Sequence, residues 1–141
     1  MSKFDTLIQQ YVSLSYDELL AFARRSYRDL REELTHPGRS HESPEDGILI
    51  LLTASMAADG KLSPEEHRFI CDLLDRQDSY EDTLRRMRAL GAQACRRKAD
   101  TLADSLPASK KASLVSLCLC FMASDGVVTE DEAEFIRKLM A

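Results

Sequence analysis

A repeated motif constrains this chain more than any other feature of its sequence. Residues 50–74 and 116–140 align without a gap, and identity falls on special positions: Met56/Met122, Ala57/Ala123, Asp59/Asp125, Gly60/Gly126, Glu66/Glu132, Phe69/Phe135, Ile70/Ile136 and Leu73/Leu139. Two units are too few for a solenoid, in which every repeat needs neighbours on both sides. We therefore expect a pseudo-symmetric pair inside one domain.

Helical periodicity runs through the whole chain, and no segment alternates convincingly like a strand. The pattern predicts an all-α bundle of seven to eight helices, as a single domain over residues 1–141 with repeat units at about 44–75 and 107–141. Two helices, predicted at 44–58 and 108–124, are apolar around much of their circumference. We expect these two helices to be central and to pack together, so that both Asp-Gly loops open toward a common region.

Composition narrows the class of protein. The chain has 141 residues with 24 acidic and 19 basic side chains, a net charge of −5, which weighs against nucleic acid as the main partner. No stretch is apolar for long enough to cross a bilayer, and the first residues lack a signal peptide, so we expect a cytoplasmic protein without a transmembrane segment. The four cysteines are expected to be reduced packing residues.

Most of the repeated motif is explained by helix-capping chemistry. Gly60 and Gly126 suit the left-handed conformation just past a helix end. The segments 63–66 and 129–132 each read as a capping box, in which a serine or threonine and a glutamate satisfy each other's backbone N–H groups. The Phe-Ile-x-x-Leu positions that follow are core stripes. On this interpretation the acids are structural.

The aspartates do not fit that interpretation as well. Asp59 and Asp125 are predicted at helix C-termini, where the helix dipole makes a negative charge cost about 0.3–1 kcal/mol. Further acids stand in both loops: Glu65 and Glu66 in the first, and Glu130, Asp131 and Glu132 in the second. Carboxylates gathered beside helix-end carbonyls suit a divalent cation such as calcium, manganese, magnesium or zinc. Cation binding and pure capping both stay open at this point.

An EF-hand is the sharper calcium hypothesis, and it fails. Asp-Gly followed by glutamate matches the second half of such a loop, but the first half needs oxygen ligands at its positions 1 and 3. Those positions hold Ser55 and Ala57 in one copy, and Phe121 and Ala123 in the other. A site would therefore draw carboxylates from both copies.

The two segments 57–66 (AADGKLSPEE) and 123–132 (ASDGVVTEDE) resemble the paired signatures of the TerB-like, tellurite-resistance-associated family. The resemblance implies an all-helical bacterial bundle whose clustered acids bind metal ions. It places Asp59, Glu66, Asp125 and Glu132 at the family's acidic positions. Glu65 and Asp131, the neighbouring acids in the two loops, are further candidate ligands.

Three functions compete at this stage. The first is a non-catalytic accessory domain that binds a divalent cation in a metal, tellurite or envelope stress response and acts through protein partners, among them membrane-associated complexes. The second is a protein-interaction bundle in which the acids are structural or recognise a basic partner. The third, an enzyme, would use His67 and Cys71, but the second copy has Ala133 and Arg137 there, so we expect no catalysis and no organic cofactor. The sequence leaves open whether the chain forms a homodimer.

Overall fold

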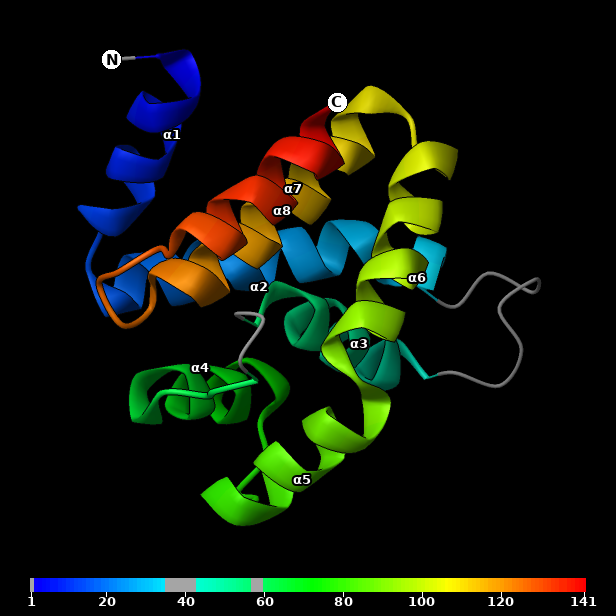
Figure 1. The fold of residues 1–141 in the computed structure, drawn as a ribbon. Helices are drawn as coiled ribbons and strands as arrows, with labels where there is room; N and C mark the ends of the chain where they lie inside the picture. Colours follow the sequence, from blue (N-terminus) through cyan, green and yellow to red (C-terminus); the bar gives the residue numbers. More distant parts are fainter. Residues whose placement is uncertain (1, 35–42, 57–59) are drawn as a thin grey trace.

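The computed structural model describes residues 2–34, 43–56 and 60–141, and within them the chain forms eight helices (Figure 1). Their bounds are α1 Lys3–Val12, α2 Tyr16–Leu34, α3 Pro44–Ser55, α4 Pro64–Leu74, α5 Tyr80–Leu90, α6 Ala92–Ser105, α7 Ala108–Ala123 and α8 Glu130–Met140. Every regular element in the described part of the chain is a helix. The predicted all-α fold is confirmed.

Capping residues set the beginnings of most of these helices. The hydroxyls of Ser2, Ser43, Ser63, Ser79 and Thr129 each accept a hydrogen bond from the backbone N–H three residues later. Gly91, with φ of 79°, separates α5 from α6 because its conformation is one that few other residues adopt. Helix beginnings were therefore predictable from local chemistry.

The predicted end of α3 is wrong. The repeat predicts a helix over 44–58, but α3 ends at Ser55 and Met56 is extended, with φ of −64° and ψ of 149°. Its counterpart α7 continues to Ala123, the position that aligns with residue 57. The two copies therefore differ in the length of their first helix. Asp59 lies outside the described residues.

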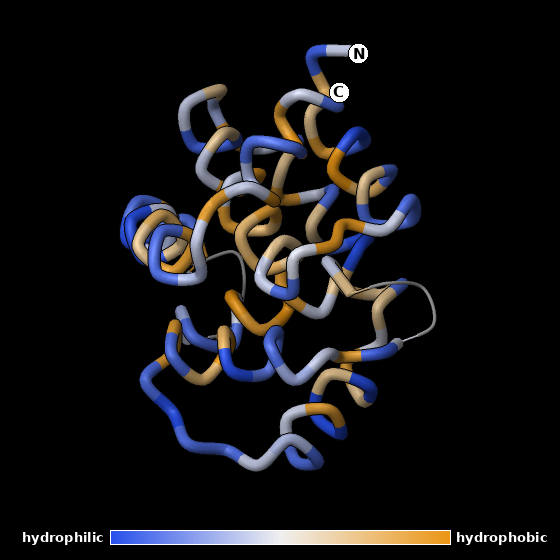
Figure 2. The backbone as a smooth tube through the Cα atoms, turned by 90° about the vertical axis from the view of Figure 1, so that its left-hand side faces the viewer, coloured by the Kyte–Doolittle hydropathy of each residue, from blue (hydrophilic) through white to orange (hydrophobic). Residues whose placement is uncertain are grey.

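Helices α3 and α7 form the centre of the molecule, as predicted. Residues 47–55 of α3 and 117–123 of α7 are all buried, and apolar segments run through the middle of the backbone trace in Figure 2 while polar ones lie outside. The two helices contact each other, but α7 packs most extensively against α2, and α3 against α6. The expected direct pairing is thus only part of the core.

A chain of aromatic contacts ties the first repeat to the second. The ring of Phe69 on α4 meets Tyr16 of α2 and Phe121 of α7, each with ring centroids 6.2 Å apart. Both phenylalanines are fully buried. Because edge-on aromatic pairs add to the burial of apolar surface, Phe69 fixes α4 beside the central helix α7.

Helix α1 has no fully buried residue. It attaches to the rest of the domain through partly buried side chains and a 3.0 Å hydrogen bond, which the Tyr11 hydroxyl donates to the Ser116 hydroxyl of α7.

All four cysteines are free, as predicted; three are buried and Cys71 is half-buried. None of the helices in the described segments combines the length and hydrophobicity needed to cross a bilayer.

The aromatic contact predicts a stability difference. Phe121→Ala should lower the free energy of unfolding by about 3–5 kcal/mol, because it leaves a cavity against Phe69. Phe22→Ala, at an exposed position of α2, should cost less than about 1 kcal/mol. Urea unfolding followed by circular dichroism measures both, and equal losses would contradict the assigned core.

Candidate functional site

The two repeats build the same hydrogen-bonded turn in front of α4 and α8. In the first, the Ser63 hydroxyl accepts from the Glu66 N–H at 3.0 Å, and Glu66 Oε1 accepts from the Ser63 N–H at 2.9 Å. In the second, the corresponding distances between Thr129 and Glu132 are 3.1 and 2.9 Å. Both predicted capping boxes are confirmed, so each glutamate has a structural role.

Both capping glutamates are buried, which capping itself does not require. Glu66 is 5% exposed and Glu132 is 4% exposed. Burial raises the pKa of each carboxyl group to about 7, against the opposing effect of the hydrogen bonds from its capping partner. Burial therefore favours the protonated form of both groups, in contrast to an exposed glutamate.

A third capping box in the same chain provides an internal comparison. At the start of α2, Glu18 Oε1 accepts from the Ser15 N–H at 3.0 Å, and the Glu18 N–H donates to the Ser15 hydroxyl at 3.2 Å. Glu18 is exposed, and the hydrogen bonds from Ser15 lower the pKa of its carboxyl group. The same local chemistry thus gives opposite pKa shifts, and burial decides the sign.

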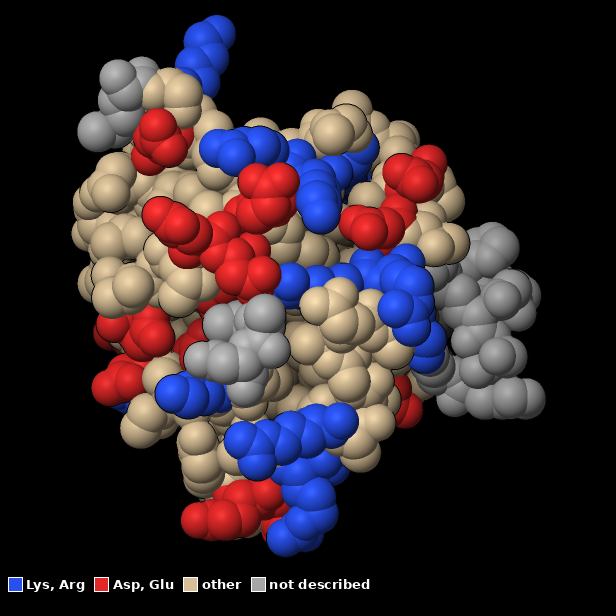
Figure 3. Space-filling model, in the orientation of Figure 1, with Lys and Arg blue, Asp and Glu red and all other residues tan. Residues whose placement is uncertain are grey.

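Acids of the two loops lie within electrostatic reach of one another. The negative charges of Glu132 and Asp125, both from the second repeat, help to raise the pKa of Glu66 in the first. Asp125 and Asp131 do the same for the pKa of Glu132. The described parts of the two loops therefore share one region of negative potential. Figure 3 shows acidic side chains gathered over α8.

Asp125 is exposed at the tip of the second loop. Its Oδ1 accepts a hydrogen bond from the Val127 N–H at 3.1 Å, and Gly126 follows with φ of 85°. This is the local turn that an aspartate can form with its own backbone. Of the other predicted ligands, Glu65 is exposed on the first turn of α4, and Asp59 lies outside the described residues.

Asp131 is engaged by an arginine. Its two carboxylate oxygens accept from Nη1 and Nη2 of Arg96 at 3.1 and 2.7 Å, a bidentate ion pair. The guanidinium also lies 5.2 Å from the centre of the Phe135 ring, and the Arg96 side chain is only 14% exposed. Because a bidentate pair occupies both oxygens, Asp131 is the weakest of the predicted metal ligands.

The same arginine explains why α3 ends early. Arg96 Nε donates to the carbonyl of Ala54 at 2.9 Å, and Nη2 donates to the carbonyl of Met56 at 2.6 Å. In a longer helix these carbonyls would accept from N–H groups one turn later. The guanidinium supplies the donors instead, so the extended conformation at Met56 leaves neither carbonyl unsatisfied.

Arg96 is the residue that sequence reasoning missed. It stands in the basic run Arg96-Arg97-Lys98 of α6, which is ordinary for an exposed helix face. The repeat offers no signal either, because α6 lies between the two copies and has no counterpart. The helical register of α6 is the one indication that the Arg96 side chain is half-buried. Arg96 directly follows Cys95 and stands three positions before Ala99, and both of these residues are buried.

No ready-made chelate is present in the described part of the chain. Among residues 2–34, 43–56 and 60–141, no three histidine, cysteine, aspartate or glutamate side chains are grouped closely enough to hold a metal ion. Glu66, Asp125 and Glu132 offer hard oxygen atoms, which is the donor chemistry that calcium and magnesium prefer. These oxygen donors suit calcium or magnesium chemically. In the described part of the chain, however, the carboxylates are too far apart to form a coordination sphere.

The His67–Cys71 pair contacts the segment that precedes α5. The Cys71 sulfur is 3.4 Å from His67 Nε2, which is also 3.0 Å from the carbonyl of Asp78. Burial and the nearby charges of Asp78 and Asp72 raise the pKa of the Cys71 thiol. A reactive cysteine needs the opposite shift, so this pair lacks the electrostatic setting of a nucleophile.

Comparison with known families decides the identity of the fold. Residues 45–141, from the first turn of α3 to the C-terminus, match the family described as "Tellurite resistance protein TerB". The chain belongs to the TerB family. The matched region of this TerB chain contains both repeats and Arg96, whereas α1 and α2 precede it. No curated protein and no solved structure matches the chain.

The first prediction for the site concerns Arg96. Arg96→Ala should lower the free energy of unfolding by about 2–4 kcal/mol, because it leaves the carbonyls of Ala54 and Met56 without their donor and Asp131 without its partner. Arg97→Ala, the exposed neighbour, should cost less than about 0.5 kcal/mol. Urea unfolding of the two variants at pH 7 makes the comparison, and an Arg96 variant as stable as the Arg97 variant would refute this role.

A second prediction concerns pH. The pKa of Glu66 and Glu132 is about 7 in the folded protein, above the ordinary value of 4.5, so the folded state binds more protons between these values. Their contribution to stability is complete below pH 4.5 and is lost as the pH rises through 7. The double variant Glu66→Gln/Glu132→Gln should therefore gain stability relative to wild type as pH rises from 5 to 8.

The matched control is Glu65→Gln, at the exposed position next to Glu66. Its stability difference from wild type should stay constant over the same range. The measurement is urea unfolding in a metal-free buffer at several pH values. If the double variant tracks wild type at every pH, the two glutamates are not titrating with raised pKa values.

Proposed function

We propose that this TerB domain is a non-catalytic accessory domain that binds a divalent cation between its two Asp-Gly loops. The supporting observation is the burial of two carboxyl groups, Glu66 and Glu132, one from each repeat and both within electrostatic reach of Asp125. Buried, mutually repelling carboxylates cost free energy that a bound cation would recover. Membership of the family described as tellurite resistance protein TerB supports a role in tellurite resistance.

In this proposal Glu66, Asp125 and Glu132 hold the ion, and Asp59 is the fourth ligand that the sequence predicts. A bound cation would neutralise the negative potential shared by the loops. Each capping glutamate uses Oε1 for its backbone hydrogen bond, so Oε2 is the oxygen that turns to the ion. Because binding requires the ionised carboxylates, cation uptake releases protons and strengthens as the pH rises toward 8.

The biological setting we propose is a bacterial metal, tellurite or envelope stress response, in which the domain acts through protein partners, including membrane-associated complexes. The second candidate function is a protein-interaction bundle without a metal. It is favoured by the capping boxes, which account for Glu66 and Glu132, and by the ion pair of Asp131 with Arg96. On that alternative the acids are structural, and the domain's surface alone recognises partners.

Thermal melting with magnesium, calcium, manganese and zinc separates the two functions. At an ion concentration of about 100 times Kd, binding should stabilise the fold by roughly 2.7 kcal/mol. Asp125→Asn and Glu132→Gln should abolish that gain, and we expect the same of Asp59→Asn. Zinc also needs the variant Cys71→Ser, because His67 and Cys71 offer it a separate place to bind.

Glu130→Gln is the matched control, since Glu130 is exposed on the same first turn of α8. It should melt like wild type with and without the ion. A wild-type protein indifferent to all four cations would overturn cation binding and favour the protein-interaction bundle. A gain that survives Asp125→Asn and Glu132→Gln alike would place the ion elsewhere.

A further inference from the structure

One face of α4 has a histidine and a cysteine that the helix–loop–helix repeat does not need. His67 and Cys71 are four positions apart, which places them on the same side of the helix. The corresponding positions of α8 hold Ala133 and Arg137, and the Arg137 guanidinium lies 4.6 Å from the centre of the Phe4 ring of α1. The shared fold therefore accepts quite different side chains here, so the pair in α4 needs a separate explanation.

Three donor atoms of different kinds meet at this pair. The Cys71 sulfur lies 3.4 Å from His67 Nε2 and 3.8 Å from the backbone carbonyl oxygen of Asp78, and the nitrogen and the oxygen lie 3.0 Å apart. Thiolate sulfur, imidazole nitrogen and oxygen are the atoms that bind zinc in proteins. The third donor is a backbone atom, so this group does not depend on a third ligating side chain.

The spacing of these atoms fits one face of a tetrahedral zinc site. With zinc–ligand bonds of about 2.0–2.3 Å, tetrahedral geometry places neighbouring ligand atoms about 3.3–3.7 Å apart. The observed distances of 3.4, 3.8 and 3.0 Å depart from that range by about 0.3 Å or less. A small shift of the His67 ring away from the Asp78 carbonyl therefore completes the face.

Contacts outside the group hold the donors in place. Tyr80 meets the His67 ring edge-on, with ring centroids 5.6 Å apart, and the Tyr80 hydroxyl donates to the carbonyl of Leu62. The side chain of Asp78 is fixed by Arg76, whose Nε lies 2.8 Å from its carboxylate. Because the imidazole and the carbonyl are both held before an ion arrives, the group is preorganised.

The group is also open to solvent and lies in a negative potential. His67, Cys71 and Asp78 are each half-buried, so an ion reaches them without unfolding α4. Burial and the charges of Asp78 and Asp72 raise the pKa of the Cys71 thiol. These charges disfavour a bare thiolate but favour a cation bound to it, because a coordinated metal ion stabilises the deprotonated sulfur.

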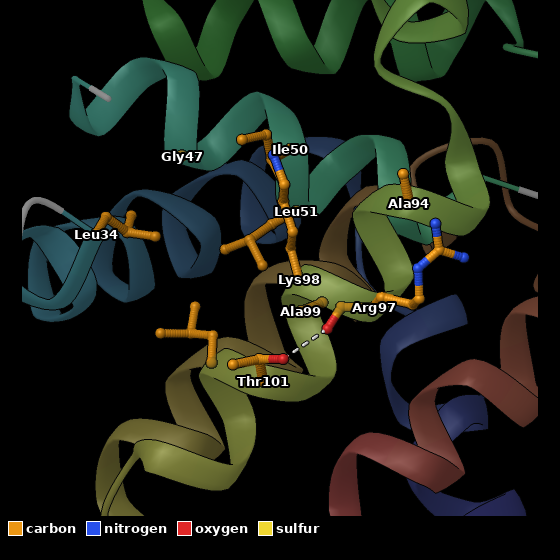
Figure 4. A pocket seen from close by; sticks show the side chains of 10 residues that line it. Leu34, Gly47, Ile50, Leu51, Ala94, Arg97, Lys98, Ala99 and Thr101 are labelled. Atoms are coloured by element: carbon orange, nitrogen blue, oxygen red, sulfur yellow. Dashed lines mark hydrogen bonds between the residues drawn. The ribbon is translucent and has the colours of Figure 1, made fainter. Parts of the chain in front are cut away.

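The rest of the described chain offers such an ion less. The other three cysteines, Cys95, Cys118 and Cys120, are at most 1% exposed. A cavity of about 490 Å³ lies between α3 and α6, and its described lining includes no histidine, cysteine, aspartate or glutamate (Figure 4). The exposed face of α4 is therefore the better place for a metal ion that prefers sulfur and nitrogen.

We propose that Cys71, His67 and the backbone carbonyl of Asp78 bind a zinc ion, with water as the fourth ligand. The thiol proton leaves to solvent when the sulfur binds, and the neutral imidazole binds through Nε2 with its proton on Nδ1. This site shares no ligand with the carboxylates of the Asp-Gly loops, so it holds whether or not those loops bind a cation.

Cobalt(II) tests the site directly, because it takes the same ligands as zinc and absorbs light when a thiolate binds it. Titration of the reduced full chain with cobalt(II) should give a thiolate-to-cobalt charge-transfer band in the near ultraviolet that saturates. Zinc should displace the cobalt and remove the band. An excess of magnesium should leave the band in place, since magnesium prefers oxygen ligands.

Two variants assign the ligands. Cys71→Ser should abolish the band. His67→Ala should weaken cobalt binding at least about tenfold, because even the loss of a group that only orients a ligand costs about 10–100-fold in affinity. Cys118→Ala, which removes a buried thiol, and Asp125→Asn, in the second Asp-Gly loop, are the controls and should keep the band. Far-ultraviolet circular dichroism checks that each variant is folded.

Four results would overturn the proposal. These are the absence of the charge-transfer band, a band that persists in Cys71→Ser, cobalt affinity unchanged in His67→Ala, and displacement of cobalt by magnesium. A band that depends on both residues, in a protein whose melting ignores magnesium and calcium, would support this site and count against the acid site alone.

Discussion

Arg96 donates hydrogen bonds to two carbonyl groups at the end of α3 and forms a bidentate ion pair with the carboxylate of Asp131 on α8. One side chain from the segment between the repeats thereby joins the end of the first buried helix to the beginning of the last. It also sets where the first Asp-Gly loop begins, because the guanidinium replaces the N–H groups of another helical turn. The difference in length between α3 and α7 follows from this contact.

The capping glutamates carry two physical demands that conflict. A capping residue stabilises a helix beginning by about 1 kcal/mol. In a capping box the ionised carboxylate is the stronger acceptor and also interacts favourably with the helix dipole. Burial penalises the ionised form, and in Glu66 and Glu132 burial prevails, as their pKa of about 7 indicates. The exposed box of Ser15 and Glu18 caps α2 without that cost. Capping alone therefore does not account for the burial of the repeated acids, and this is why we favour a ligand.

Much of the fold could be predicted from the sequence because it rests on local chemistry. Capping serines, the break at Gly91 and the apolar helices α3 and α7 all act within one or two turns. What escaped prediction depends on contacts between distant segments. The early end of α3 requires Arg96 from 40 residues further on. The burial of Glu66 depends on the tertiary packing around α4. The capping boxes were predictable, but the electrostatic reach of Asp125 to Glu66 was not.

The buried Glu66 and Glu132 and the exposed Asp125 share one region of negative potential across the two repeats. ¹³C NMR titration of the Glu66 side-chain carboxyl group in metal-free protein tests this claim. We expect a pKa well above the ordinary value of 4.5 in wild type, close to the 7 that burial and neighbouring charges produce. Replacing the second-repeat charges, by Asp125→Asn or Glu132→Gln, should lower that pKa, whereas Glu130→Gln should not. A Glu66 pKa that is ordinary, or that ignores both second-repeat substitutions, would contradict the claim.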